Sequence, residues 1–304
     1  MSISILLIGA GGALGQPLLQ ELIRQKDAFK AIGILATSSE KAEKFAWVKA
    51  KEIKVIEGSF FDPKSYESFT HVVSAVGNAL MGQQSKMIDA AIAGGVTHFY
   101  PSEWNSDISQ KEISGMRYFQ DKQLTRSHLA AKAKDHPNFT YTLFITGIFT
   151  EWTFLEFYGF DHEKLEVYAY GTPDAHVGMT SIPDIAHYTI SSLLLPFEAN
   201  GPSRSERTIR VQATKTTFQK LVDALGAAKG VKYKSHYLPI EKAVEKQKQA
   251  KENGDELGEV MWSIRPLVAS GFGIADGAAG SKLDNDLFDF VPETMEETFT
   301  RLFR

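Results

Sequence analysis

The chain has 304 residues, of which 43% are hydrophobic and 23% charged, with a net charge of -4 and no cysteine. This charge argues against a broad basic face for nucleic acid, and the missing cysteine excludes disulfides, thiolate zinc sites, iron–sulfur clusters and cysteine nucleophiles. Because neither a signal-peptide pattern nor a run of about 20 apolar residues occurs, we expect a cytoplasmic protein that binds no membrane.

The first half of the chain alternates short apolar runs with helical patterns. Strands are expected at residues 3–8, 31–36, 53–58, 71–76, 97–101 and 139–146. Helical patterns lie around residues 18–23 and over residues 39–50, 83–95 and 115–134. Buried strands that alternate with helices are typical of a parallel sheet covered on both faces. The sequence therefore predicts an α/β fold with a doubly wound parallel sheet, the Rossmann fold.

The pattern changes after about residue 150. Six aromatic residues fall within residues 147–160, and residues 241–256 have the composition of a solvated helix that ends at Gly254. Residues 270–282 are rich in glycine and alanine and are expected to form a mobile loop. We therefore expect a Rossmann domain over residues 1–150 and a smaller substrate-binding region over residues 151–304. Residues 178–195 are expected to return to the sheet.

A glycine-rich turn, GAGGALG at residues 9–15, follows the first strand and opens an amphipathic helix. Glycine lets a diphosphate lie close to the backbone, and the positive end of the helix then faces that anion. In this context the pattern predicts a dinucleotide site rather than a simple tight turn. The predicted binding residues are Gly9, Gly11, Gly12, Ala13, Leu14 and Gly15.

The end of the second predicted strand indicates which dinucleotide binds. An NAD site usually has an acidic residue there to hold the adenosine ribose. Here Thr37 and Ser38 occupy that place, Lys41 follows, and Glu40 is the one discordant charge. Hydroxyl groups with a lysine suit a 2′-phosphate, so NADP(H) is the expected cofactor. Ser38 can also cap the next helix, and both roles are compatible.

Tyr118 and Lys122 stand four residues apart in the helix predicted over residues 115–134, so we expect them on one face of it. This spacing is used by short-chain dehydrogenases, in which lysine holds the nicotinamide ribose and tyrosine exchanges a proton with the substrate. The helix follows the fifth strand, at the rim where open α/β sheets bind ligands. The alternative is a half-buried tyrosine and a surface lysine. The scattered histidines have no zinc-site spacing, so no metal is expected.

The segments GAGGALG (9–15), HFYPSEW (98–104) and RYFQDKQLTR (117–126) resemble the isoflavone reductase-like and NmrA-like group of atypical short-chain dehydrogenases, which includes the phenylcoumaran benzylic ether reductases. The resemblance extends through SIPDIAHYTI (181–190) to VPETMEETFTRLF (291–303). Such enzymes use NADPH to reduce plant or fungal secondary metabolites.

The resemblance also implies roles for single residues. Lys122 corresponds to the catalytic lysine of the family, which also touches the cofactor ribose. The adenosine side is expected over Val76 and Gly77, and the nicotinamide end is expected near Ser102, Glu103, Gly147 and Phe149. Thr37 stands where these reductases often have arginine, and Trp104-Asn105 replaces their Phe-Gly. Tyr118 has no usual counterpart in them.

Together these features predict an NADPH-dependent oxidoreductase that reduces a medium-sized apolar or aromatic metabolite. Lys122, with Tyr118 as a possible helper, is expected to donate the proton. The residues expected against the substrate are Trp104, Phe149 and Trp152, with residues 270–282 as a lid. A non-catalytic dinucleotide sensor of the NmrA-like kind is one alternative, and a cofactor-assisted isomerase or cyclase is another. The sequence leaves the choice between monomer and homodimer open.

Overall fold

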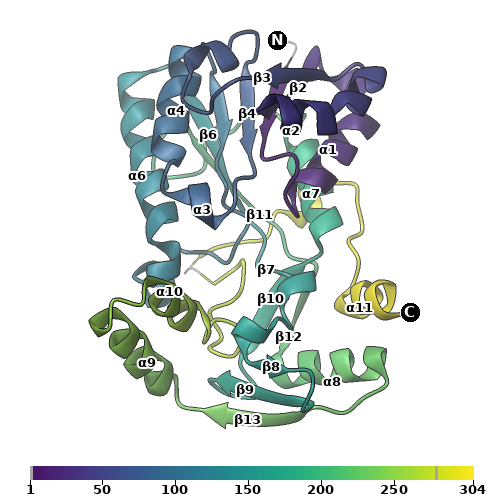
Figure 1. The fold of residues 1–304 in the computed structure, drawn as a ribbon, viewed down its shortest axis with the longest axis vertical. Coiled ribbons are helices and arrows are strands. Elements are labelled where there is room, and N and C mark those ends of the chain that lie inside the picture. The colour runs from purple at the N-terminus through teal and green to yellow at the C-terminus, as the bar shows by residue number, and fades with distance from the viewer. Residues whose placement is uncertain (1–2, 278–279) are drawn as a thin grey trace. The chain divides into compact units, whose positions relative to one another are not determined.

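The computed structural model describes residues 3–277 and 280–304, and its ribbon is drawn in Figure 1. The chain forms two compact units. The first contains the segments up to residue 103, 121–144 and 186–209, and the second contains residues 104–120, 145–185 and 210–304. The two units therefore alternate along the sequence. Residues 278–279 of the predicted lid lie outside the described residues.

A seven-stranded sheet forms the centre of the first unit, in the order β11-β6-β5-β4-β1-β2-β3. Its strands are β1 (Ser4–Ile8), β2 (Ala31–Ala36), β3 (Lys54–Glu57), β4 (His71–Ser74), β5 (His98–Tyr100), β6 (Thr140–Ile145) and β11 (Glu206–Arg210). The pairs from β3 to β6 are all parallel, with Leu6 of β1 opposite Gly33 and Val72. All five residues of β1 are buried, as expected for a parallel strand covered on both faces. The predicted Rossmann fold is confirmed.

Helices cover both faces of this sheet. They are α1 (Gly15–Arg24), α2 (Ser39–Lys44), α3 (Asn78–Met81), α4 (Gln84–Ala93), α6 (Gln120–Asp135) and α7 (Ile182–Ser192), with short 3-10 helices η1 (Lys26–Ala28), η2 (Ala46–Lys51) and η3 (Pro63–Ser65). Figure 1 shows α1 and α2 on one side of the sheet and α4 and α6 on the other, as right-handed crossovers require. The predicted apolar stripe of α1 is buried at Leu18, Leu19 and Leu22.

The second unit contains two small sheets. One has the order β12-β10-β7 and the other β13-β9-β8. The strands are β7 (Ile148–Phe149), β8 (Phe160–Asp161), β9 (Glu166–Tyr170), β10 (His176–Thr180), β12 (Thr214–Thr217) and β13 (Lys234–Leu238). The α-helices are α5 (Lys111–Ser114), α8 (Phe218–Lys229), α9 (Ile240–Glu252), α10 (Glu256–Ile264) and α11 (Met295–Phe303). The 3-10 helices are η4 (Arg117–Phe119), η5 (Thr150–Trp152), η6 (Glu156–Tyr158) and η7 (Asn285–Leu287). Much of the aromatic run over residues 147–160 packs into the core of this unit, at Phe154, Phe157, Tyr158 and Phe160.

The helix expected over residues 115–134 is shorter than predicted. The 3-10 helix η4 precedes α6, which begins at Gln120, and Met116 is extended. The backbone N–H of Tyr118 donates to the Ser263 hydroxyl at 3.0 Å instead of to a helical carbonyl. Tyr118 and Lys122 therefore do not belong to one α-helix, contrary to the expectation from their spacing. None of the helices over residues 3–277 and 280–304 combines the length and the apolar content of a bilayer span.

Candidate functional site

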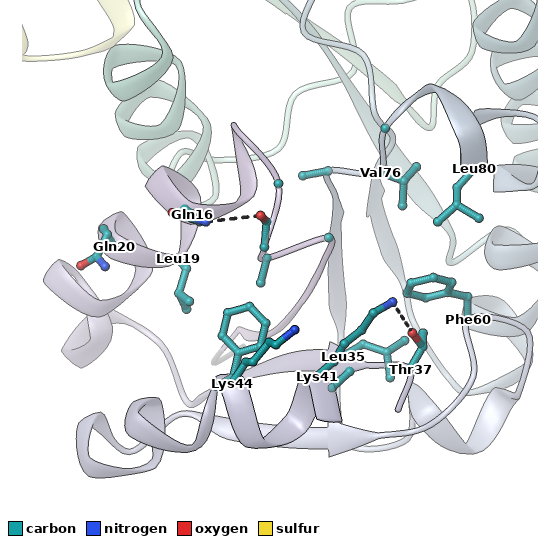
Figure 2. Close-up of a pocket in the computed structure, with 18 of the residues that line it drawn as sticks. Gln16, Leu19, Gln20, Leu35, Thr37, Lys41, Lys44, Phe60, Val76 and Leu80 are labelled. Atoms are coloured by element: carbon teal, nitrogen blue, oxygen red, sulfur yellow. Dashed lines mark hydrogen bonds between the residues drawn. The ribbon is translucent and has the colours of Figure 1, made fainter. Parts of the chain in front are cut away.

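A pocket of about 690 Å³ lies in the first unit, where β1, β2 and β4 end (Figure 2). Because parallel strands end at the same edge of a sheet, the segments that follow them converge there. Of the predicted cofactor residues, this pocket is lined by Gly9, Gly11, Gly12, Thr37, Lys41, Val76 and Gly77. Predicted residues from three separate segments of the chain therefore line one cavity.

The glycine turn requires glycine at two of its positions. Gly9 has φ of +83°, and a β-carbon there would collide with the carbonyl oxygen of Ala75. A β-carbon on Gly15 would collide with the carbonyl oxygen of Gly9. The absence of both side chains lets β1, the turn and the start of α1 pack directly against the segment after β4.

The start of α1 suits an anion. Leu14 is the N-cap residue, and no side chain of the described residues caps the helix. The Gly12 N–H donates to the Gly9 carbonyl, and the Gln16 side-chain amide donates to the Gly11 carbonyl. Among the described residues, no hydrogen bond uses the backbone N–H groups of Gly11, Ala13 or Leu14. Donors that the protein leaves open at the positive end of a helix fit a diphosphate group.

The segment after β2 adds positive charge to the pocket. The Lys41 ammonium group donates to the Thr37 hydroxyl at 3.0 Å, as the dashed line in Figure 2 shows. Lys44 also lines the pocket and pairs with Glu40, but both side chains are largely exposed, so this ion pair is weak. No acidic residue lines the pocket within the part of the chain that the structure describes. The Ser38 hydroxyl caps α2, and Ser38 is not among the lining residues.

Aromatic walls complete the pocket, and the sequence reasoning missed them. Phe45, Trp47 and Phe60 line it together with Leu35 and Leu80. Phe45 lies close to the glycine turn, within ordinary van der Waals range of a β-carbon built on Gly11. The available signal was the pair of aromatic residues one and three positions after Lys44. Flat apolar walls beside ammonium groups suit a phosphorylated nucleoside with its base.

A chain of hydrogen bonds connects the pocket wall to the segment after β5. The Ser102 hydroxyl donates to the Val76 carbonyl at 2.8 Å, and the Ser102 N–H donates to the Gln84 side chain at 2.9 Å. The same oxygen of Gln84 accepts from the Ser74 hydroxyl. Ser102 is therefore held against Val76, which lines the pocket, and the next residue is Glu103.

Glu103 makes two contacts with α6. Its carboxylate accepts from Arg126 Nε at 3.1 Å and from Arg126 Nη2 at 2.7 Å, and its side chain is only 1% exposed. Its backbone carbonyl accepts from Lys122 Nζ. Lys122 and Arg126 are one helical turn apart, so a single residue fixes both. The two-pronged pair with Arg126 holds α6 in the register that brings the lysine to the Glu103 carbonyl.

Lys122 is 7% exposed, so its ammonium group is largely removed from water. Burial lowers the pKa of Lys122 to about 8, while Glu103 acts to raise it and Arg126 acts to lower it further. A group with a pKa near neutrality can give up and recover a proton under working conditions. Its burial therefore contradicts the alternative of a surface lysine and makes Lys122 a candidate for acid–base chemistry.

The remaining predicted residues lie in the second unit. Phe149 is buried and its ring lies 4.6 Å from the ring of Trp152, which is 36% exposed. Trp104 is buried and has φ of +30°, a left-handed value that is unfavourable for a bulky side chain. Gly147 also has positive φ, and a β-carbon there would collide with Gly178. Tyr118 packs edge-on against Phe119. The roles of these residues stay predictions.

Comparison with known proteins supports the family resemblance. The NmrA-like family model matches residues 1–261. The oxidoreductase aprR of Aspergillus flavus is 24% identical over 243 residues, which are 79% of each chain. Three solved structures cover 99–100% of this chain and 99–100% of their own. They are AtPrR2 with NADP+ and (+)-pinoresinol (19% identity, TM-score 0.75), an isoflavone reductase (18%, 0.73) and leucoanthocyanidin reductase of Vitis vinifera with NADPH (16%, 0.72). At these identities the structural likeness shows the fold.

Proposed function

The chain belongs to the NmrA-like family, and on that premise we propose that it is an NADP(H)-dependent oxidoreductase. The observation that carries this proposal is the buried Lys122, held by Glu103 next to the segment that forms a wall of the pocket. A protein that only bound a dinucleotide would need the glycine turn but no titratable group buried at this place. The solved structures with NADP+ and NADPH support the choice of cofactor.

The described residues fit this cofactor. The open N–H groups at the start of α1 would hold the diphosphate, and Thr37, Lys41 and Lys44 would hold the 2′-phosphate. Val76 and Gly77 would lie under the adenosine side, and Ser102 would lie nearer the nicotinamide. NADPH, when bound, supplies a hydride from C4 of its nicotinamide.

Lys122 would supply the proton that accompanies hydride transfer. At pH 7 an ammonium group with a pKa of about 8 is mostly charged. In its buried place this charge stabilises a developing negative charge on the substrate more strongly than it would in water. Glu103 and Arg126 would position the lysine. The Glu103 carbonyl holds the Lys122 ammonium group, and the Glu103 carboxylate holds the Arg126 guanidinium group on the same helix.

The second unit would supply the substrate-binding region that the sequence assigned to residues 151–304. Phe149 and Trp152 form an aromatic pair, of which Trp152 remains partly exposed. Such a surface suits a medium-sized apolar or aromatic metabolite. Trp104 and Tyr118 are further candidates for contact with the substrate, Tyr118 through its phenol.

The proposal is tested by NADPH oxidation with a panel of aromatic substrates that includes (+)-pinoresinol and an isoflavone. Lys122→Met should lower turnover at least about 100-fold and leave NADPH affinity within about threefold. The matched control is Lys134→Met, which removes an exposed lysine of the same helix and should change neither quantity. Full activity of Lys122→Met would refute the assigned role. NADPH binding without turnover of any substrate would favour the dinucleotide sensor instead.

A further inference from the structure

A second cavity, of about 450 Å³, lies at the opposite edge of the central sheet in the first unit. Its walls include the residues at or just before the starts of β4 and β5, whereas the dinucleotide pocket lies where the strands end. The lining residues are Ile3, Thr70, His71, Thr97, His98, Tyr100, Leu193, Leu195, Pro196, Phe197 and Arg207. None of them lines the dinucleotide pocket, so this cavity is a separate place in the fold.

Arg207 is a buried cation without an acidic partner. It is 7% exposed, and no carboxylate lies within ion-pair distance of it among the described residues. Glu206 is its neighbour in β11, but alternate residues of a strand point to opposite faces, and Glu206 accepts from Tyr141 instead. Buried charges in proteins are usually paired, so an unpaired guanidinium group in a cavity is unusual.

Neutral acceptors use most of the Arg207 donors. They are the Thr142 hydroxyl, the Tyr100 hydroxyl and the carbonyl groups of Ser192 and Pro196. These four bonds hold the end of α7 and the following segment on the sheet, and they leave one of the five guanidinium N–H groups unused. These hydrogen bonds satisfy four of the Arg207 donors, but their neutral acceptors provide no counter-ion for its positive charge within the described part of the chain.

Two imidazole rings lie beside this cation. His71 and His98 stack with their centroids 5.0 Å apart. Both nitrogens of His98 bond to threonine hydroxyls, at Thr140 and Thr142. Over residues 3–277 and 280–304, His71 bonds only through Nδ1, to Thr70. Burial, helped by Arg207, lowers the pKa of His71 to about 4, and the pKa of His98 is also lowered. Both rings are therefore neutral at pH 7. In the tautomer in which His71 Nδ1 accepts from the Thr70 hydroxyl, its Nε2 carries a proton that can be donated to a ligand.

We propose that this cavity binds a small carboxylate with an apolar body. The carboxylate would lie against Arg207 and His71, and the body would lie against Phe197 and the leucines of the cavity wall. One permanent positive charge matches one carboxylate, whereas a phosphate dianion is usually met by more than one cation. The volume lies in the range of small-molecule pockets, and the apolar walls fit a hydrocarbon or aromatic ring.

The test is a calorimetric titration of the full-length protein with benzoate, compared with benzamide and inorganic phosphate. Benzoate should bind saturably, and the other two should bind at least about tenfold more weakly. By NMR, bound benzoate should raise the pKa of His71 by about one unit or more, because a nearby negative charge favours the protonated ring. Saturating NADPH should leave benzoate affinity unchanged, since the two cavities share no residues.

Variants place the binding in this cavity. Arg207→Gln should weaken benzoate binding at least about tenfold, whereas Arg204→Gln, an exposed arginine in the same segment, should leave it unchanged. Because Arg207 also holds α7, Phe197→Ala provides a second variant. Phe197 is 38% exposed, so its loss should leave the fold intact and weaken benzoate several-fold. The proposal would be overturned if benzoate did not bind saturably, or if both cavity variants bound it as tightly as the wild type. Equal affinity for phosphate or benzamide would overturn the assigned ligand class.

Discussion

Replacing Lys122 by methionine should stabilise the protein at neutral pH. Burial lowers the pKa of Lys122 from the ordinary 10.5 to about 8. Each pKa unit corresponds to about 1.4 kcal/mol, so the charged side chain costs the folded state about 3 kcal/mol at pH 7. Methionine keeps the length and the apolar stem but leaves the Glu103 carbonyl without this donor, which costs about 1 kcal/mol. The free energy of unfolding should therefore rise by about 2 kcal/mol at pH 7.

The gain in the free energy of unfolding of Lys122→Met should decrease as the pH rises. Below pH 8 the lysine is charged in the folded and in the unfolded chain, so the full cost applies. Between pH 8 and 10.5 the unfolded chain binds more protons than the folded chain, so the stability of the wild type rises with pH. The advantage of Lys122→Met should accordingly fall to nearly zero by about pH 9.5.

Urea unfolding at pH 7 and at about pH 9.5, followed by tryptophan fluorescence, measures the difference in the free energy of unfolding between Lys122→Met and the wild type. Lys134→Met, the exposed control on the same helix, should change the free energy of unfolding by less than about 0.5 kcal/mol at either pH. A Lys122→Met variant that is less stable than the wild type at pH 7 would refute the reasoning. So would a stability difference that is the same at both pH values.

Three further predictions concern the proposed reaction. If the buried lysine must be protonated, kcat/KM for reduction should fall as the pH rises through about 8. Glu103→Gln should move this fall to lower pH, because Arg126 then lowers the pKa of Lys122 without opposition from the Glu103 carboxylate. A pH profile that does not move would contradict the positioning role of Glu103. Lys41→Gln and Lys44→Gln should each weaken NADPH binding about fivefold and leave NADH binding unchanged, as fluorescence titration can check; equal losses for both cofactors would exclude a 2′-phosphate contact. Tyr118→Phe should lower turnover by no more than about twofold if lysine is the only acid, and a loss of about 100-fold would assign that role to the phenol.

Local patterns in the sequence were enough to predict the fold and to single out the glycine-rich turn. Buried strands at regular intervals predicted the parallel sheet. The close approaches at Gly9 and Gly15 show that packing against the protein's own backbone requires glycine at these two positions. The absence of an acidic residue directly after β2 could also be recognised from the sequence, because Thr37 and Lys41 lie within a few residues of the strand end. Each of these signals arises from residues that are close in the chain and interact through backbone geometry.

The alternation of the two units along the chain has no such local signal. The sequence predicted a division near residue 150 and a return to the sheet over residues 178–195, whereas the segments of the two units also exchange at several other positions. The 3-10 helix η4 directly precedes α6, and the Tyr118 N–H within it donates to Ser263, which lies far along the chain. Helical spacing alone could not reveal a competing hydrogen-bond partner at this distance.

The sequence by itself determined that a lysine follows the fifth strand, but only the tertiary structure decided its chemistry. Lys122 becomes an acid–base candidate because the Glu103 carbonyl and the Glu103–Arg126 pair hold it out of water, across 19 and 23 residues of chain. The cation of the second cavity likewise contacts acceptors as far as 107 residues away. The pKa of a side chain depends on burial and on nearby charges, and both are properties of packing that spacing along the chain does not encode.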